Sequence, residues 1–165
     1  MRIVPLLLAA WVAGLSGCMH DVKLSGYAQP RATLQVGGQP TADQLRAFAA
    51  GGGVVIDLRG PDEARGYDEA ALARQLGLRY VNVPVEGAAD LTPANAQALH
   101  AALAAAGGPV LLHCASGNRA GALLALEAAR YEGLDADAAL ALGRSAGMKS
   151  LEPAVRDRLG AMARP

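Results

Sequence analysis

A cysteine and an arginine, separated by four residues, stand within residues 113–119, which read His-Cys-Ala-Ser-Gly-Asn-Arg. Residues 109–112 before them are apolar, as in a buried strand, and Ala120 to Tyr131 have helical spacing. Loop amides at a helix N-terminus bind anions, and a guanidinium can bind two oxygens at once. The same positive field favours the thiolate of Cys114, which is the nucleophilic form. The spacing therefore predicts an oxyanion-binding loop with a reactive Cys114 exposed at the mouth of the domain.

The elements that must position this loop alternate between strand and helix patterns. We expect strands at 33–36, 54–58, 80–83 and 109–113, and helices at 41–50, 67–76, 92–106, 120–131, 136–142 and 152–159. The alternation predicts an α/β fold with a mainly parallel central sheet flanked by helices. Ligands bind at the carboxyl ends of such strands, so Arg59, Glu86 and Cys114 should share one rim. Arg59 and Asp57 are expected to form an ion pair under the loop.

The loop resembles that of the cysteine-dependent phosphatases, in which His-Cys-x5-Arg is followed by Ser or Thr. Here only four residues separate Cys114 from Arg119, and Ala120 replaces the hydroxyl residue. A Cys-x4 loop with Ser-Gly-Asn-Arg also resembles the rhodanese sulfurtransferases.

Other segments favour the first resemblance, because in chain order they look like the bacterial beta-lactamase hydrolase-like, phosphatase-like family (the DUF442 type). They lie at 38–40, 55–59, 76–80, 83–85 and 108–114, and the likeness covers residues 37–158. The resemblance implies a hydrolase related to the protein tyrosine and dual-specificity phosphatases, acting on phosphorylated or other anionic substrates and needing no cofactor.

In that interpretation the Cys114 thiolate attacks phosphorus while Arg119 and the loop backbone hold the oxygens. The substrate-binding residues are Ala115, Ser116, Gly117 and Asn118. The leaving group needs a proton from a carboxylic acid. By resemblance this acid lies after Pro84, where Asp90 is slightly favoured over Glu86, and the third alternative is that neither residue is the acid. Without a hydroxyl at Ala120, turnover should be slow.

Two alternatives stay open on the sequence. A loop one residue shorter makes a narrower cradle, which suits a single sulfur atom carried as a persulfide on Cys114. The chain would then be a rhodanese-like sulfurtransferase. A third possibility is a non-catalytic module that binds anions or phosphorylated ligands.

The N-terminus has the pattern of an export signal. Met1-Arg2 precedes an apolar run, and residues 15–18 resemble a bacterial lipobox. We expect a lipoprotein signal peptide at 1–17, lipidation of Cys18, a flexible tether at 18–32 and a catalytic domain at 33–165. The resemblance implies a lipid-anchored protein that faces the periplasm, on the outer membrane.

Composition excludes several other classes. The 15 basic and 15 acidic residues balance, and only 4% of residues are aromatic, so nucleic-acid binding has no support. If Cys18 is lipidated, one thiol remains and no internal disulfide can form. The three histidines are far apart, and no Cys/His spacing indicates a metal site.

Overall fold

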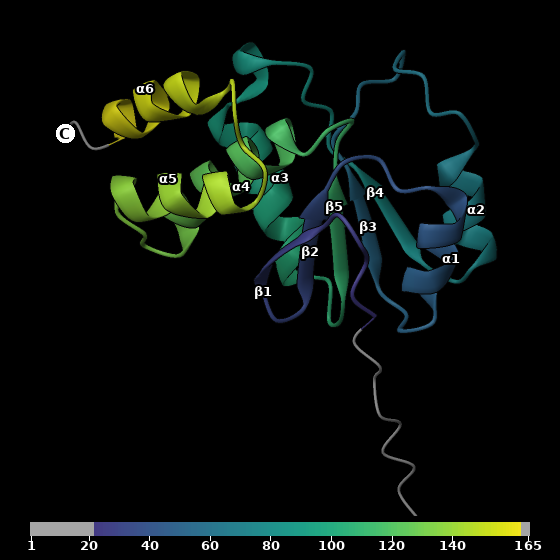
Figure 1. The fold of residues 1–165 in the computed structure, drawn as a ribbon. Helices are drawn as coiled ribbons and strands as arrows, with labels where there is room; N and C mark the ends of the chain where they lie inside the picture. The colour runs from purple at the N-terminus through teal and green to yellow at the C-terminus, as the bar shows by residue number, and fades with distance from the viewer. Residues whose placement is uncertain (1–21, 163–165) are drawn as a thin grey trace, which may run out of the picture.

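The computed structural model describes residues 22–162, whose strands form one five-stranded sheet (Figure 1). The strand order is β1-β2-β5-β3-β4. β1 is antiparallel to β2, and every other neighbouring pair is parallel. The strands are β1 Ala28–Arg31, β2 Leu34–Gly37, β3 Val54–Asp57, β4 Arg79–Asn82 and β5 Val110–His113. The predicted mainly parallel α/β fold is confirmed.

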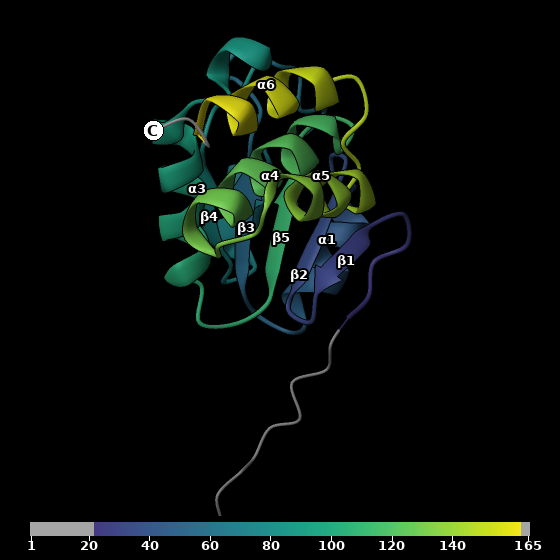
Figure 2. The same cartoon turned by 90° about the vertical axis from the view of Figure 1, so that its left-hand side faces the viewer.

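Helices cover both faces of the sheet: α1 and α2 pack on one side, and α3 to α6 on the other (Figures 1 and 2). They span α1 Ala42–Ala49, α2 Glu69–Gln75, α3 Pro93–Ala104, α4 Asn118–Tyr131, α5 Ala136–Ser145 and α6 Glu152–Met162, with a short 3-10 helix, η1, at Ala88–Asp90. None of the helices in residues 22–162 has the length and apolar character needed to span a bilayer.

Local signals explain where several helices begin. The Thr41 side chain accepts a hydrogen bond from the Gln44 amide, and the Gln44 side chain accepts one from the Thr41 amide, which together form a capping box. At the start of α3, the Thr92 side chain accepts a hydrogen bond from the Asn95 amide, and Pro93 occupies the first helical position. Both starts agree with the sequence prediction.

The two sides of the sheet carry separate hydrophobic cores. In β5, Leu112 packs in the core under α3 to α6, and its neighbour Leu111 packs in the core under α1 and α2. All four residues of β5 are buried. A strand covered on both faces is expected to be apolar throughout, and the alternating sides explain why the run at 109–112 has no polar residue.

The N-terminal part of the described chain differs from the prediction. Residues 28–31 of the expected tether form β1, so β2 lies inside the sheet and not at its edge. Gln35 holds the preceding segment, because its side chain accepts from the Leu24 amide at 2.7 Å and donates to the Val22 carbonyl at 2.6 Å. The predicted signal peptide and Cys18 lie outside the described residues, so export and lipidation stay predictions.

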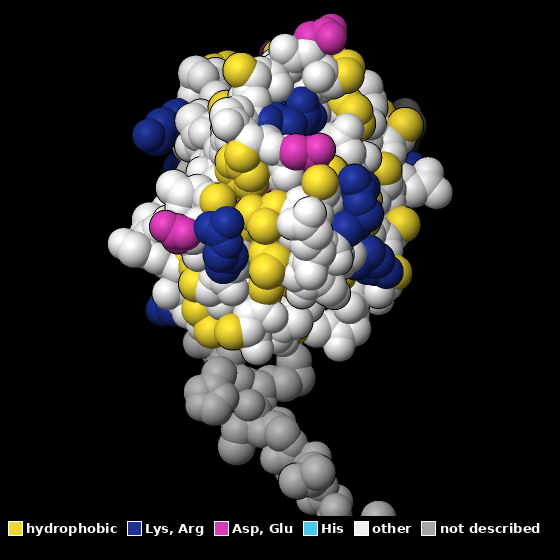
Figure 3. All heavy atoms as spheres, turned by 90° about the vertical axis from the view of Figure 1, so that its right-hand side faces the viewer, with side chains coloured by type: hydrophobic (Ala, Val, Ile, Leu, Met, Phe, Trp, Pro, Cys, Tyr) yellow, Lys and Arg dark blue, Asp and Glu magenta, His cyan; other side chains and the backbone are white. Residues whose placement is uncertain are grey.

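The outer surface over α1 and α2 has hydrophobic side chains in its centre, with Lys and Arg side chains around them (Figure 3). Leu72 and Leu76 of this layer are only partly buried against the core beneath them. Because α1 and α2 are short, part of the apolar surface of this helical layer stays in contact with solvent.

Candidate active site

The carboxyl ends of three adjacent strands converge at the predicted loop. His113, the last residue of β5, is in register with Gly37 of β2 on one side and with Asp57 of β3 on the other. Cys114 follows directly, and α4 begins four residues later at Asn118. The parallel sheet therefore places Cys114 at its rim, as the sequence indicated.

The backbone of the loop wraps around the cysteine sulfur. The Gly117 amide donates a hydrogen bond to Cys114 Sγ at 3.1 Å. Gly117 has a φ of +90°, a conformation that side chains disfavour, so glycine is what lets the chain turn into α4 here. The segment after β2 holds the outside of the loop, because the Gln39 amide donates to the Ala115 carbonyl at 3.2 Å and Gly38 bridges to Ser116.

Cys114 itself has no accessible surface, so the expectation of an exposed thiol is wrong for this structure. The turn that brings the Gly117 amide to the sulfur also closes the loop over it. Cys114 belongs to the hydrophobic core on its inner side. The sulfur is therefore a hydrogen-bond acceptor at the floor of the site and not a group at its mouth.

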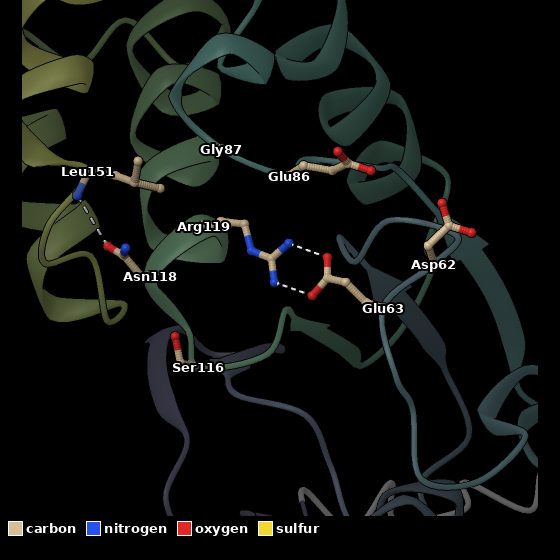
Figure 4. Close-up of a pocket in the computed structure, with 8 residues that line it drawn as sticks. All are labelled: Asp62, Glu63, Glu86, Gly87, Ser116, Asn118, Arg119 and Leu151. Atoms are coloured by element: carbon tan, nitrogen blue, oxygen red, sulfur yellow. Dashed lines mark hydrogen bonds and ion pairs between the residues drawn. The ribbon is translucent and has the colours of Figure 1, made fainter.

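Arg119 extends from the first turn of α4 and forms a two-pronged ion pair with Glu63 (Figure 4). Its Nη1 donates to Glu63 Oε1 at 2.5 Å and to the Val85 carbonyl at 2.8 Å, and its Nη2 donates to Glu63 Oε2 at 2.7 Å. These bonds to Glu63, joined by the charge of Cys114, raise the pKa of Arg119. The guanidinium is thus held charged, within electrostatic reach of the sulfur.

An open pocket of about 550 Å³ lies over this pair. Its lining contains one cation, Arg119, and three carboxylates, and Ser116 and Asn118 form the side nearest the loop (Figure 4). The lining residues are Asp62, Glu63, Glu86, Gly87, Ser116, Asn118, Arg119 and Leu151. Arg119 is thus the charged group of this lining that can attract an anion.

The two candidate acids occupy different places. The Asp90 side chain accepts a hydrogen bond from the Glu86 amide at 2.8 Å, and Asp90 is not among the lining residues. Glu86 lines the pocket, and its carboxylate lies against Gly60, where an added Cβ would come within 2.5 Å of Oε1. Asp90 therefore shapes the loop that presents Glu86.

Among the remaining loop residues, two are exposed to solvent and one, Asn118, anchors the loop to a neighbouring segment. Ala115 and Ser116 are exposed, and Ser116 lines the pocket. The Asn118 side chain accepts from the Lys149 amide at 2.7 Å and donates to Ser150 at 2.8 Å, which ties the loop to the segment between α5 and α6. The Asn118 side chain is thus occupied in anchoring the loop, so only the backbone of Asn118 would contact a substrate.

Charged side chains are buried beneath the loop. The Arg59 guanidinium donates to both carboxylate oxygens of Asp57, each at 2.9 Å, which confirms the expected ion pair. Burial raises the pKa of Asp57, but the bonds from Arg59 and Tyr80 and the charge of His113 outweigh burial and lower it to about 2. Arg59 also bonds Glu69, whose other oxygen lies 2.7 Å from His113 Nε2.

Ligand atoms of Asp57, Glu69 and His113 lie within 4.8 Å of one another, a spacing that could hold a metal ion. No motif or spacing in the sequence indicated this grouping. The residues do not fit a metal as they stand, because the Arg59 guanidinium already binds both carboxylates and supplies the positive charge between them.

Glu63 and Glu69 are the partners that sequence reasoning missed. Glu63 lies 56 positions before Arg119, and Glu69 belongs to a different helix from any loop residue. A carboxylate in a loop or a first helical turn usually serves as a cap or a solvated charge, so no local signal distinguishes these two.

The fold defines this protein as an α/β protein with a mainly parallel sheet, an architecture that it shares with the solved structures of Tk-PTP and PTPMT1. A family model for the "Beta-lactamase hydrolase-like protein, phosphatase-like domain" matches residues 31–131. The chain belongs to this family.

Relatives agree with the assignment. A beta-lactamase hydrolase-like protein of Xylella fastidiosa (strain Temecula1) is 39% identical over 119 residues, which cover 69% of this chain and 27% of the relative. This chain thus spans about a quarter of the relative's length.

Solved structures show the same fold at lower identity. A DUF442 protein of Shewanella putrefaciens CN-32, described as a phosphatase, is 24% identical with a TM-score of 0.63, over 83% of this chain and 92% of that one. TpbA of P. aeruginosa, in complex with pTyr as a cysteine-to-serine variant, is 23% identical with a TM-score of 0.56, over 86% and 98%.

Proposed function

We propose that this chain is a cysteine-dependent hydrolase of phosphate monoesters, with Cys114 as nucleophile and Arg119 as the group that binds the phosphoryl oxygens. The loop between β5 and α4 carries the proposal, because Gly117 bonds the sulfur and Arg119 reaches the same site from the next turn. Membership of a phosphatase-like family supports phosphoryl transfer over persulfide chemistry.

The hydrogen-bond inventory of Arg119 shows how it could bind substrate. A guanidinium has five N–H donors. Glu63 and the Val85 carbonyl take both hydrogens of Nη1 and one of Nη2. Within residues 22–162 no oxygen accepts from the Nε hydrogen or from the second Nη2 hydrogen, and the Cys114 side chain is near enough to the guanidinium to raise its pKa. The edge formed by these two hydrogens can bind two phosphoryl oxygens while Glu63 holds the neighbouring edge in place.

The reaction proceeds in two displacements. The thiolate of Cys114 forms a bond to phosphorus as the ester P–O bond breaks, and the leaving alkoxide takes a proton from a carboxylic acid, giving an alcohol and a cysteinyl phosphate. Water then attacks phosphorus, the same carboxylate takes its proton, and the S–P bond breaks to release phosphate and the thiolate.

Glu86 is better placed than Asp90 to act as the general acid. Glu86 lines the pocket above Arg119, whereas the Asp90 carboxylate is engaged by the Glu86 amide. Because Cys114 has no accessible surface, phosphorus reaches the sulfur only after the loop around it opens, while Glu63 keeps Arg119 in place.

The test measures aryl-phosphate hydrolysis by the purified protein. Phosphotyrosine is a suitable first substrate, since the structural relative TpbA binds it. We expect Cys114→Ser to abolish hydrolysis, and thiosulfate with cyanide to yield no thiocyanate. Hydrolysis that persists in Cys114→Ser, or thiocyanate release by the wild type, would refute the proposal.

A matched pair of variants tests the acid. Glu86→Gln should slow hydrolysis most for esters with strongly basic leaving groups, which need a proton in the transition state. Asp90→Asn should slow good and poor leaving groups alike, because it only loosens the loop. The reverse pattern would assign the acid to Asp90.

A further inference from the structure

A second pocket, of about 240 Å³, shares Ser116 with the pocket over Arg119. The described residues that line it include two cations, Arg144 and Lys149, and no carboxylate, and most of the others are Gly, Ala or Ser. We propose that this basic pocket binds a second phosphoryl group of the substrate, which is therefore a small molecule with two phosphates. The inference deepens the proposed function and rests on it.

The charged side chains of the two pockets are opposite in sign. The pocket over Arg119 contains the carboxylates of Asp62, Glu63 and Glu86. All three lie on the side of Arg119 away from Ser116 (Figure 4). A second phosphoryl group is repelled by like charges on that side and attracted by the cations beyond Ser116. The charges thus fix the direction in which a doubly phosphorylated molecule extends from Arg119.

The segment after α5 holds the basic pocket against the Cys114 loop. The Lys149 amide donates to Asn118 Oδ1 at 2.7 Å, and Asn118 is the first residue of α4, next to Arg119. Gly147 also packs on the loop, because a Cβ added there would lie 3.4 Å from the Gly117 carbonyl oxygen. The two pockets therefore keep a fixed spacing, so one molecule can occupy both without first ordering the protein.

Lys149 is the cation of the basic pocket that is available to a ligand. Arg144 donates from Nε and Nη2 to the two carboxylate oxygens of Glu152, at 2.8 and 2.6 Å, so its charge is balanced. Lys149 is exposed and forms no ion pair within residues 22–162. Its ammonium has three hydrogens to donate, and hydrogen bonds between ionised groups are stronger than those between neutral ones.

The size of the basic pocket suits one substituent and not a whole ligand. Pockets for complete drug-sized ligands usually enclose about 300–1,000 Å³. The basic pocket, at about 240 Å³, is smaller, whereas the pocket over Arg119, at about 550 Å³, lies within that range. The two together fit one molecule that crosses Ser116, with the ester phosphate at Arg119 and the second phosphate at Lys149.

The test measures the binding of non-hydrolysable probes by calorimetry. Linear alkane bisphosphonates of increasing chain length are compared with alkyl monophosphonates of the same lengths. We expect the best-fitting bisphosphonate to have a Kd about tenfold below that of its matched monophosphonate, the lower end for a hydrogen bond to a charged group. The two identical ends of a bisphosphonate alone would give only about twofold.

A matched pair of lysine variants locates the second phosphonate. Lys149→Met keeps the length of the side chain and removes its charge, so most of the preference for the bisphosphonate should disappear. Lys23→Met is the control, because Lys23 is the other lysine of the chain, is exposed and lines neither pocket. This variant should keep the preference of the wild type.

Equal binding of bisphosphonate and monophosphonate by the wild type, at every chain length, overturns the inference whether or not a variant folds. So does a preference that persists in Lys149→Met, or one that is lost equally in Lys23→Met. Binding is measured without turnover, which separates the two proposals. A protein that prefers bisphosphonates but hydrolyses no phosphate ester refutes the proposed function alone. Hydrolysis of simple esters without that preference refutes this inference alone.

Discussion

At the scale of single residues, the bond between Arg119 and Glu63 admits two roles. In the first role, the Glu63 carboxylate occupies the place of a substrate oxyanion. In the second, it holds the Arg119 guanidinium in the position that binds such an oxyanion. Two observations favour the second role: Arg119 makes a third bond, to the Val85 carbonyl, and no oxygen within residues 22–162 accepts from its Nε hydrogen. Glu63 has a pKa lowered chiefly by its hydrogen bond from Arg119, so the pair stays ionised as the solution becomes mildly acidic.

Glu63→Ala should therefore lower kcat/KM for aryl phosphates by about 10- to 100-fold, the usual cost of a misplaced binding group. Asp62→Ala is the control, because Asp62 lines the same pocket and forms no ion pair within residues 22–162. A rise in activity in Glu63→Ala would show instead that the carboxylate blocks the site.

At the scale of elements, helices α4 and α5 pack closely against each other where Gly121 of α4 meets Gly143 of α5. A Cβ added to Gly121 of α4 would lie 2.5 Å from the Gly143 carbonyl oxygen and 2.6 Å from the Met148 nitrogen. Both are backbone atoms, which cannot move as a flexible side chain could. The crossing also supports the site, because Asn118 in the first turn of α4 binds the segment that follows α5.

We expect Gly121→Ala to destabilise the fold by about 1–3 kcal/mol, the range for overpacked cores. Gly160→Ala is the comparison: its added Cβ meets nothing within 4 Å on an exposed turn of α6, so the better helix propensity of alanine should raise stability by up to about 1 kcal/mol. Urea unfolding measures both, and equal midpoints would contradict the close crossing.

Elements with local signals could be predicted from the sequence, and those without could not. Thr41 and Thr92 predict the starts of their helices, because a helix cap depends only on residues within three positions along the chain. β1 was missed because Ala28–Arg31 has no apolar alternation and becomes a strand only by pairing with β2. The Cys114 loop was recognisable as one segment, whereas Glu63 and Glu69 reach it only through the folded sheet.

At the scale of the whole molecule, a buried charged cluster under the loop joins strands β3 and β5 to helix α2. Asp57, Arg59, Glu69 and His113 have no accessible surface. Removing one charged side chain from such a cluster leaves its partner buried without an opposite charge, which lowers the free energy of unfolding by about 3–5 kcal/mol. The charged groups under the loop should therefore stabilise the fold as a set.

The lowered pKa of Asp57 gives this stabilisation a pH dependence. Its folded pKa is about 2, against 3.8 for the free side chain, so the unfolded chain binds the proton first as the pH falls. Stability from Asp57 is complete above pH 3.8 and is lost as the pH falls through about 2. Asp57→Asn should unfold at lower urea concentration at pH 6, and the difference from the wild type should shrink toward pH 2. A difference that is constant with pH would assign the effect to packing alone.

The inaccessible sulfur of Cys114 has a consequence for damage by oxidants. Peroxide attacks a thiolate only where it can touch the sulfur, and in this structure Cys114 has no surface that even a water-sized molecule can reach. Sulfenic acid could then form only in the open state that also admits an ester. Inactivation and turnover would compete for one transient conformation, so a saturating anionic ligand should delay both together.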